Sequence, residues 1–92
     1  MKMNNTPSID KYTHVKMTCN NALIFNAKAV SIAILDRLGK SIWRKERGLS
    51  AEPIVWEGID SFGINVGPGS LTCKITYPDN VVIYVPFVFL QK

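Results

Sequence analysis

The sequence predicts an all-β fold, an immunoglobulin-like sandwich of about seven strands. Short apolar segments recur roughly every eight to twelve residues, separated by glycine, proline, asparagine and aspartate, which is typical of such sandwiches. Several segments alternate between apolar and polar residues, as a strand with one buried face does. No segment has a helical period, because the nearest candidate, residues 35–46, contains Gly39 and follows a β-branched stretch.

Length and composition fit one small globular domain. The chain has 92 residues, of which 47% are hydrophobic and 20% are charged. This length fits a single domain, and the composition is too apolar for a disordered chain. We expect a flexible polar segment over residues 1–10 and a single domain over residues 11–92.

The strands are predicted from alternation and from the turns between them. In chain order they are residues 12–19, 22–25, 29–35, 41–47, 54–56, 70–77 and 81–90. Asn20 and Asn21 mark a turn, Gly39 lies in a hairpin loop, and residues 58–69 form a glycine-rich connection. This succession of short strands and turns favours two packed sheets.

Two segments carry a resemblance to a known family. Residues 30–40 form an apolar strand that ends in Asp-x-x-Gly-Lys, and residues 55–69 contain Trp-Glu-Gly-x-Asp-x-x-Gly followed by further glycines. Together they resemble the immunoglobulin-like domain of the bacterial flagellar hook-capping protein and related domains of exported bacterial proteins, over residues 30–75. The motif positions are Asp36, Gly39, Trp56, Glu57, Gly58, Asp60, Gly63 and Gly67.

The resemblance implies a module without enzymatic activity and without a cofactor. It implies a structural, assembly or protein–protein interaction domain of a bacterial surface or secreted assembly, such as a filament, an appendage or a secretion-linked protein. It also implies an extracytoplasmic location and other protein subunits as partners. In the sequence itself we see no signal peptide and no window with the roughly 18 apolar residues of a membrane span.

The last predicted strand, residues 81–90, is apolar at every position, whereas a strand with one wet face should alternate. Pro86 has no N–H group for a ladder and predicts an edge strand. We expect one face of this strand to contact another subunit, including a second copy of the chain. The residues of this predicted interaction face are Ile83, Val85, Phe87 and Phe89. The alternative is that loops or the N-terminal segment cover the face within the same chain.

Few residues suit catalysis or metal binding. His14 is the only histidine and no nucleophile motif accompanies it, so we expect no catalytic site. Glu57 and Asp60 could form an acid–base pair or bind calcium, but Asp60 is more typical of a turn residue whose carboxylate accepts hydrogen bonds from loop amides. Cys19 and Cys73 lack metal-ligand spacing, and they are either buried thiols or a disulfide. We expect no metal site.

The sequence also contains features found in proteins that bind nucleic acid or carbohydrate. The net charge is +4, and basic residues gather in the middle of the chain. They are Arg37, Lys40, Arg44, Lys45 and Arg47. No nucleic-acid recognition motif accompanies them, so a solvated hairpin is the preferred interpretation and no nucleic-acid partner is expected. The alternative function is a carbohydrate-binding sandwich that uses Trp43 or Trp56 as a stacking platform.

Overall fold

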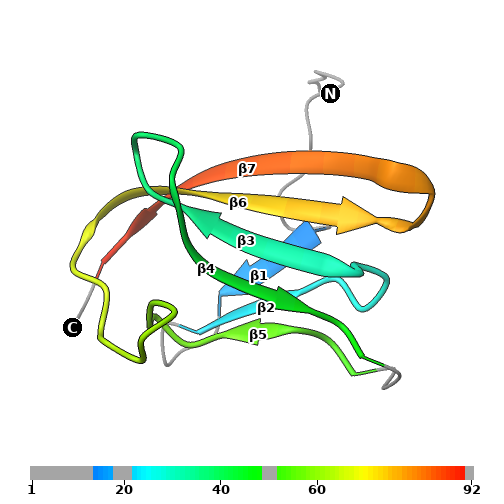
Figure 1. The fold of residues 1–92 in the computed structure, drawn as a ribbon, viewed down its shortest axis with the longest axis horizontal. Coiled ribbons are helices and arrows are strands. Elements are labelled where there is room, and N and C mark those ends of the chain that lie inside the picture. The colour runs from blue at the N-terminus through cyan, green and yellow to red at the C-terminus, as the bar shows by residue number, and fades with distance from the viewer. Residues whose placement is uncertain (1–13, 18–21, 49–51, 91–92) are drawn as a thin grey trace, which may run out of the picture.

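The computed structural model describes residues 14–17, 22–48 and 52–90. This part of the chain forms two antiparallel sheets packed against each other (Figure 1). The strands are β1 (Val15–Met17), β2 (Leu23–Phe25), β3 (Ser31–Leu35), β4 (Ser41–Glu46), β5 (Val55–Trp56), β6 (Gly69–Tyr77) and β7 (Val81–Phe89). A short 3-10 turn, η1 (Pro78–Asn80), joins β6 to β7. The prediction of an all-β chain is confirmed, and the predicted flexible segment over residues 1–10 lies outside the described residues.

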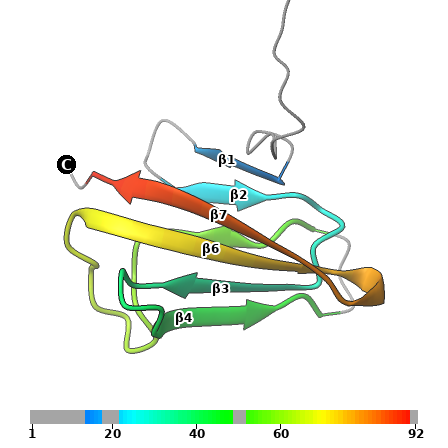
Figure 2. The same ribbon diagram turned by 90° about the horizontal axis from the view of Figure 1, so that it is seen from above.

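The smaller sheet has the strand order β1-β2-β5 and the larger sheet the order β4-β3-β6-β7. Figure 2 shows the four strands of the larger sheet in this order, with β7 and β4 at its two edges. The chain crosses between the sheets after β2 and again on each side of β5. The longest ladder joins β6 to β7, from the pair Gly69 and Phe89 to the pair Tyr77 and Val81.

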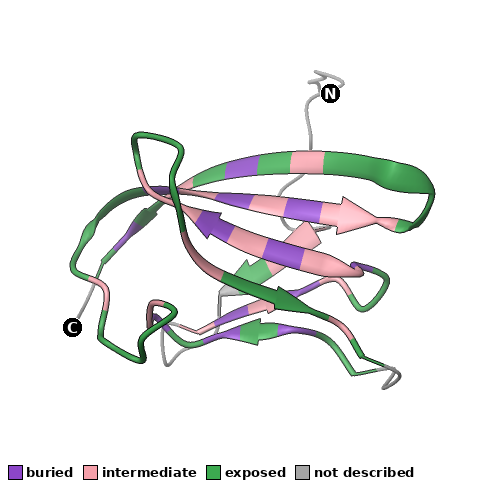
Figure 3. Ribbon diagram, viewed as in Figure 1, coloured by how far each residue is buried: buried purple, intermediate pink, exposed green. Residues whose placement is uncertain are grey.

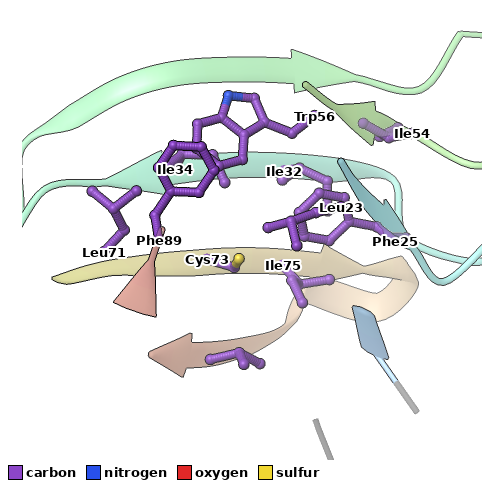
Figure 4. Packing of buried hydrophobic residues seen from close by; sticks show 12 residues of the cluster. Leu23, Phe25, Ile32, Ile34, Ile54, Trp56, Leu71, Cys73, Ile75 and Phe89 are labelled. Atoms are coloured by element: carbon purple, nitrogen blue, oxygen red, sulfur yellow. The ribbon is translucent and has the colours of Figure 1, made fainter. Parts of the chain in front are cut away.

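The hydrophobic core lies between the two sheets (Figures 3 and 4). Buried and partly exposed residues alternate along β3 and along most of β6, so each of these strands turns one face to the core, as the period of two predicts. The buried apolar residues are Leu23, Phe25, Ala29, Ile32, Ile34, Ile54, Trp56, Leu71, Cys73, Ile75, Val85 and Phe89. Because the core takes one face of the larger sheet, the opposite face of that sheet remains on the surface.

Strand register decides which side chains share each face. Directly paired residues of antiparallel strands lie on the same face, and successive residues of a strand lie on opposite faces. One row across the larger sheet points to the core and consists of Trp43, Ile34, Cys73 and Val85. The next row points outward and consists of Arg44, Ala33, Lys74 and Tyr84. These rows separate the residues that stabilise the fold from those available to a ligand or partner.

Candidate functional site

Strand β7 lies at an edge of the larger sheet formed by the described residues. It pairs with β6 on one side, and no other strand in the described part of the chain pairs with its second side. The edge position predicted from Pro86 is therefore confirmed. Pro86 pairs with Thr72 of β6, and a proline is tolerated in a ladder where its missing N–H would face away from the neighbouring strand.

The open side of β7 presents backbone groups at alternate residues. The carbonyl of Thr76 accepts a hydrogen bond from the amide of Val30, with N···O 2.8 Å, so Thr76 directs its backbone groups away from β7. Val82 lies opposite Thr76 and therefore directs its own groups away from β6. By the same alternation the N–H and C=O groups of Tyr84 and Val88 point to the open side. Pro86 offers only a carbonyl there.

The structure corrects the choice of interaction face on β7. The predicted residues Ile83, Val85, Phe87 and Phe89 lie on the core side of the strand. Val85 and Phe89 are buried, and Ile83 and Phe87 are partly buried against the core. The aromatic ring of Phe89 lies 5.1 Å from that of Trp56 in the opposite sheet, and the ring of Phe87 lies 6.2 Å from it. The opposite sheet, rather than a loop, therefore covers this face.

The other face of β7 is the one that meets solvent. Its apolar side chains are substantially exposed: Val82 39%, Tyr84 52% and Val88 61%. Leu90, just beyond the strand, is 68% exposed. These residues form a continuous outer row beside the open backbone edge, which we call the β7 edge surface (Val82, Tyr84, Val88 and Leu90). A contiguous apolar strip of this kind is typical of interaction sites.

Strand β4, at the opposite edge of the same sheet, is protected. The carbonyl of Ile42 accepts hydrogen bonds from the amide of Ser61 at 2.8 Å and from its hydroxyl at 3.1 Å. The exposed end of β4 carries the charged residues Arg44, Lys45 and Glu46. A covering loop and charged side chains are common protections against edge-to-edge pairing. On β7, Pro86 is the one residue among those described that hinders such pairing.

The motif around Trp56 builds the core of the domain. Trp56 is buried, and its indole Nε1 donates a hydrogen bond of 2.7 Å to the carbonyl of Ile59. Gly58 has φ +83°, and a Cβ atom there would lie 2.9 Å from Cζ of Phe89. Both the backbone conformation and the close ring therefore require glycine at this position. Glu57 is exposed.

The other motif residues form two turns with the same hydrogen bonds. Oδ1 of Asp36 accepts from the amides of residues 38 and 40, and Oδ1 of Asp60 accepts from those of residues 62 and 64, at 2.8–3.0 Å. Gly39 and Gly63 follow with φ +87° and +80°, and each donates its amide to the carbonyl of the aspartate. Gly67 has no positive φ, and nothing lies within 4 Å of the position that a Cβ atom would take there, so nothing in the structure explains that glycine.

These twin turns display two large apolar side chains that the sequence interpretation missed. Leu38 is 86% exposed and Phe62 is 87% exposed, each in the middle of its turn. The signal was the Asp-x-x-Gly pattern, which predicts a turn, with Leu38 and Phe62 inside it. Both turns lie at the end of the sandwich where β7 also ends (Figure 1).

Asp60 and His14 each have a hydrogen-bond partner within the fold. Asp60 is a turn residue, as its position predicted, since its carboxylate is occupied by loop amides. Nδ1 of His14 lies 2.6 Å from the hydroxyl of Tyr77, and burial raises the pKa of Tyr77. Cys73 is a free thiol in the core, where burial raises its pKa to about 12, and Cys19 lies outside the described residues. The described residues contain no group of three or more metal-ligating side chains.

Two neighbouring basic residues of β4 point to opposite faces of the sheet, and both tryptophans pack in or against the core. Arg44 points to the outer face and Lys45 to the inner side, because they pair with Ala33 and Ile32 respectively. Arg44 also forms a salt bridge of 2.8 Å with Glu46. Trp56 has no exposed surface for a sugar, and Trp43 packs against the core, with its ring 6.4 Å from that of Trp56. The proposed tryptophan platform is therefore wrong for Trp56.

Comparison with known protein families, curated proteins and solved structures found no match to this chain. Within the described residues there is no helix of the length and apolar character needed to cross a membrane. The candidate site therefore rests on the geometry of β7 and of the outer sheet face.

Proposed function

We propose that this chain is a non-enzymatic protein–protein interaction domain that joins another protein subunit at the free edge of β7. The observation that carries the proposal is the difference between the two edges of the larger sheet. The edge at β4 is covered by Ser61 and by charged side chains, whereas β7 combines open backbone groups with the apolar β7 edge surface. Addition of a strand from a partner would use both features, because main-chain hydrogen bonds supply affinity and side-chain contacts supply specificity.

We further propose that the domain is an immunoglobulin-like sandwich. Its strand order supports this, since β1, β2 and β5 form one sheet while β3, β6 and β7 form the other, as strands A, B, E and C, F, G do in that fold. The fourth strand, β4, pairs with β3 and lies in the second sheet. The sequence resemblance over residues 30–75 supports the same assignment. It also supports our proposal of an extracytoplasmic bacterial assembly as the setting.

A second copy of the chain is the first partner to test. Two β7 strands related by a twofold axis would pair antiparallel and join two larger sheets into one. Light scattering over a concentration series should then show a dimer or a larger species. The series should be measured in the presence of a reductant, so that no disulfide between copies contributes to the observed mass.

Two lysine variants make this measurement specific to the edge. Replacing both Val82 and Val88 with lysine places charges along the open side of β7 and should shift the chain to monomer. Leu38→Lys is the control, since it places a lysine at an exposed apolar residue in the turn between β3 and β4, at the opposite edge of the sheet from β7, and should leave association unchanged. A chain that is monomeric at every concentration contradicts self-pairing. Equal loss of association in both variants contradicts the assignment to β7.

A further inference from the structure

The outer face of the larger sheet contains a shallow hollow of about 390 Å³. Three residues of β3 line its floor, Ser31, Ala33 and Leu35, and the first two have small side chains. Longer side chains surround this floor: Arg44 from β4, Lys74 from β6 and Tyr84 from β7. The volume falls in the range of sites for small ligands.

Strand register explains why the hollow exists and why it is cationic. Arg44, Ala33, Lys74 and Tyr84 occupy one row across the four strands. Neighbouring strands are about 4.8 Å apart, so Arg44 and Lys74 start about 10 Å from each other with only the methyl group of Ala33 between them. Two long cationic side chains therefore share the rim of one depression.

The chemistry around this depression favours a negatively charged group. The guanidinium of Arg44 is suited to bidentate contact with a carboxylate, sulfate or phosphate, and Lys74 adds a point charge. Hydroxyl groups of Ser31 and Thr76 also line the hollow and can donate hydrogen bonds. Glu46 pairs with Arg44, but both side chains are about two-thirds exposed, at 65% and 67%, so the pair is weak enough for a ligand to displace.

We propose that this hollow binds the carboxylate, sulfate or phosphate group of a small ligand, held by Arg44 and Lys74 above Ala33. Tyr84 contacts the remainder of the ligand. Tyr84 is the one aromatic side chain that lines the hollow, whereas surfaces that bind single-stranded nucleic acid stack successive bases on several rings. The hollow adjoins the β7 edge surface, with which it shares Tyr84, but its charged residues lie on β4 and β6.

Amide NMR of the full chain tests the proposal with three separate probes: glucuronate, sulfate and inorganic phosphate. Saturable shifts of amides in β3, β4 and β6 are expected, with affinities in the millimolar range. The probe that binds best identifies the source as an acidic sugar, a sulfated compound or a phosphorylated one. No saturable shift on this face with any probe would overturn the proposal.

Three charge variants assign the binding to the hollow. Lys74→Gln and Arg44→Gln should each weaken binding about five- to tenfold. Lys45→Gln, next to Arg44 but on the other side of β4, should change it by less than about twofold. Equal losses in Lys45→Gln and Lys74→Gln would overturn the proposal.

Two further measurements test the salt bridge of Arg44 and the binding of nucleic acid. Glu46→Gln should strengthen binding, because it releases Arg44 from its salt bridge, and a weakening would contradict the assigned role of Arg44. A short single-stranded DNA should bind no more tightly than the best small probe. Tighter DNA binding that falls equally in Lys45→Gln and Lys74→Gln would point to a general nucleic-acid surface and overturn the proposal.

Discussion

Gly58→Ala is the change whose cost the structure defines most closely. Gly58 has φ +83°, a conformation that costs an L-residue roughly 1–2 kcal/mol. The new methyl group would also lie 2.9 Å from Cζ of Phe89, a ring held in the core against Trp56. Forcing a methyl group into a packed core typically costs about 1–3 kcal/mol more. We therefore expect Gly58→Ala to lower the free energy of unfolding by about 2–5 kcal/mol.

Gly63→Ala provides the matched control. Gly63 has nearly the same backbone conformation, with φ +80°, but nothing lies within 4 Å of its Cβ position. This variant should show the backbone cost alone, about 1–2 kcal/mol, less a small gain from restricting the unfolded chain. The difference between the two variants isolates the contact with Phe89.

Urea unfolding followed by tryptophan fluorescence measures both variants, because Trp56 is buried and lies against Phe89. A Phe89→Leu background removes the ring, so Gly58→Ala should there cost no more than Gly63→Ala. Equal costs of the two alanine variants in the native background would refute the steric argument. An unchanged difference in the Phe89→Leu background would show that another neighbour is responsible.

Three further predictions concern the core thiol, a turn and the edge strand. Burial raises the pKa of Cys73 from 9.0 to about 12, so the contribution of the neutral thiol to stability is fully present below pH 9. The free energy of unfolding should fall as the pH rises from 9 towards 12, at up to about 1.4 kcal/mol per pH unit. In Cys73→Ala, the free energy of unfolding measured with urea should fall less steeply over this pH range. Asp36→Ala should lower the free energy of unfolding by about 1 kcal/mol through the loss of two amide hydrogen bonds, and Asp36→Asn, which keeps an acceptor oxygen, should lose less. Pro86→Val should restore an N–H group on the open side of β7 and strengthen self-association in light scattering, whereas weaker association would contradict the proposed edge pairing.

The strands could be predicted from sequence because alternation and turn residues specify them locally. The predicted edge position of the last strand also required only one residue, since Pro86 cannot donate to a ladder. The aspartates and glycines of the twin turns could also be predicted, because turn residues act on the backbone next to them. Each of these features depends on a residue and its near neighbours in the chain.

The face of β7 could not be chosen from sequence, because both of its faces are apolar. What decides it is the pairing of Val85 with Cys73, a contact between strands that alternation within β7 does not encode. The outer hollow was missed for a similar reason. Arg44 and Lys74 are distant in sequence, and only the register of β3 with both neighbours brings them to one row.

The register of β7 with β6 therefore places alternate residues of β7 in two different environments. Val85 and Phe89 fill the core, while Val82 and Val88 lie on the solvent side. A slip by a single residue would exchange the two sets, placing phenylalanine rings in water. The turn between β6 and β7 opposes such a slip, because Asp79 and Asn80 both adopt positive φ, at 69° and 63°. Aspartate and asparagine tolerate this conformation better than other non-glycine residues, so the turn that fixes the core also fixes which side chains of β7 face solvent.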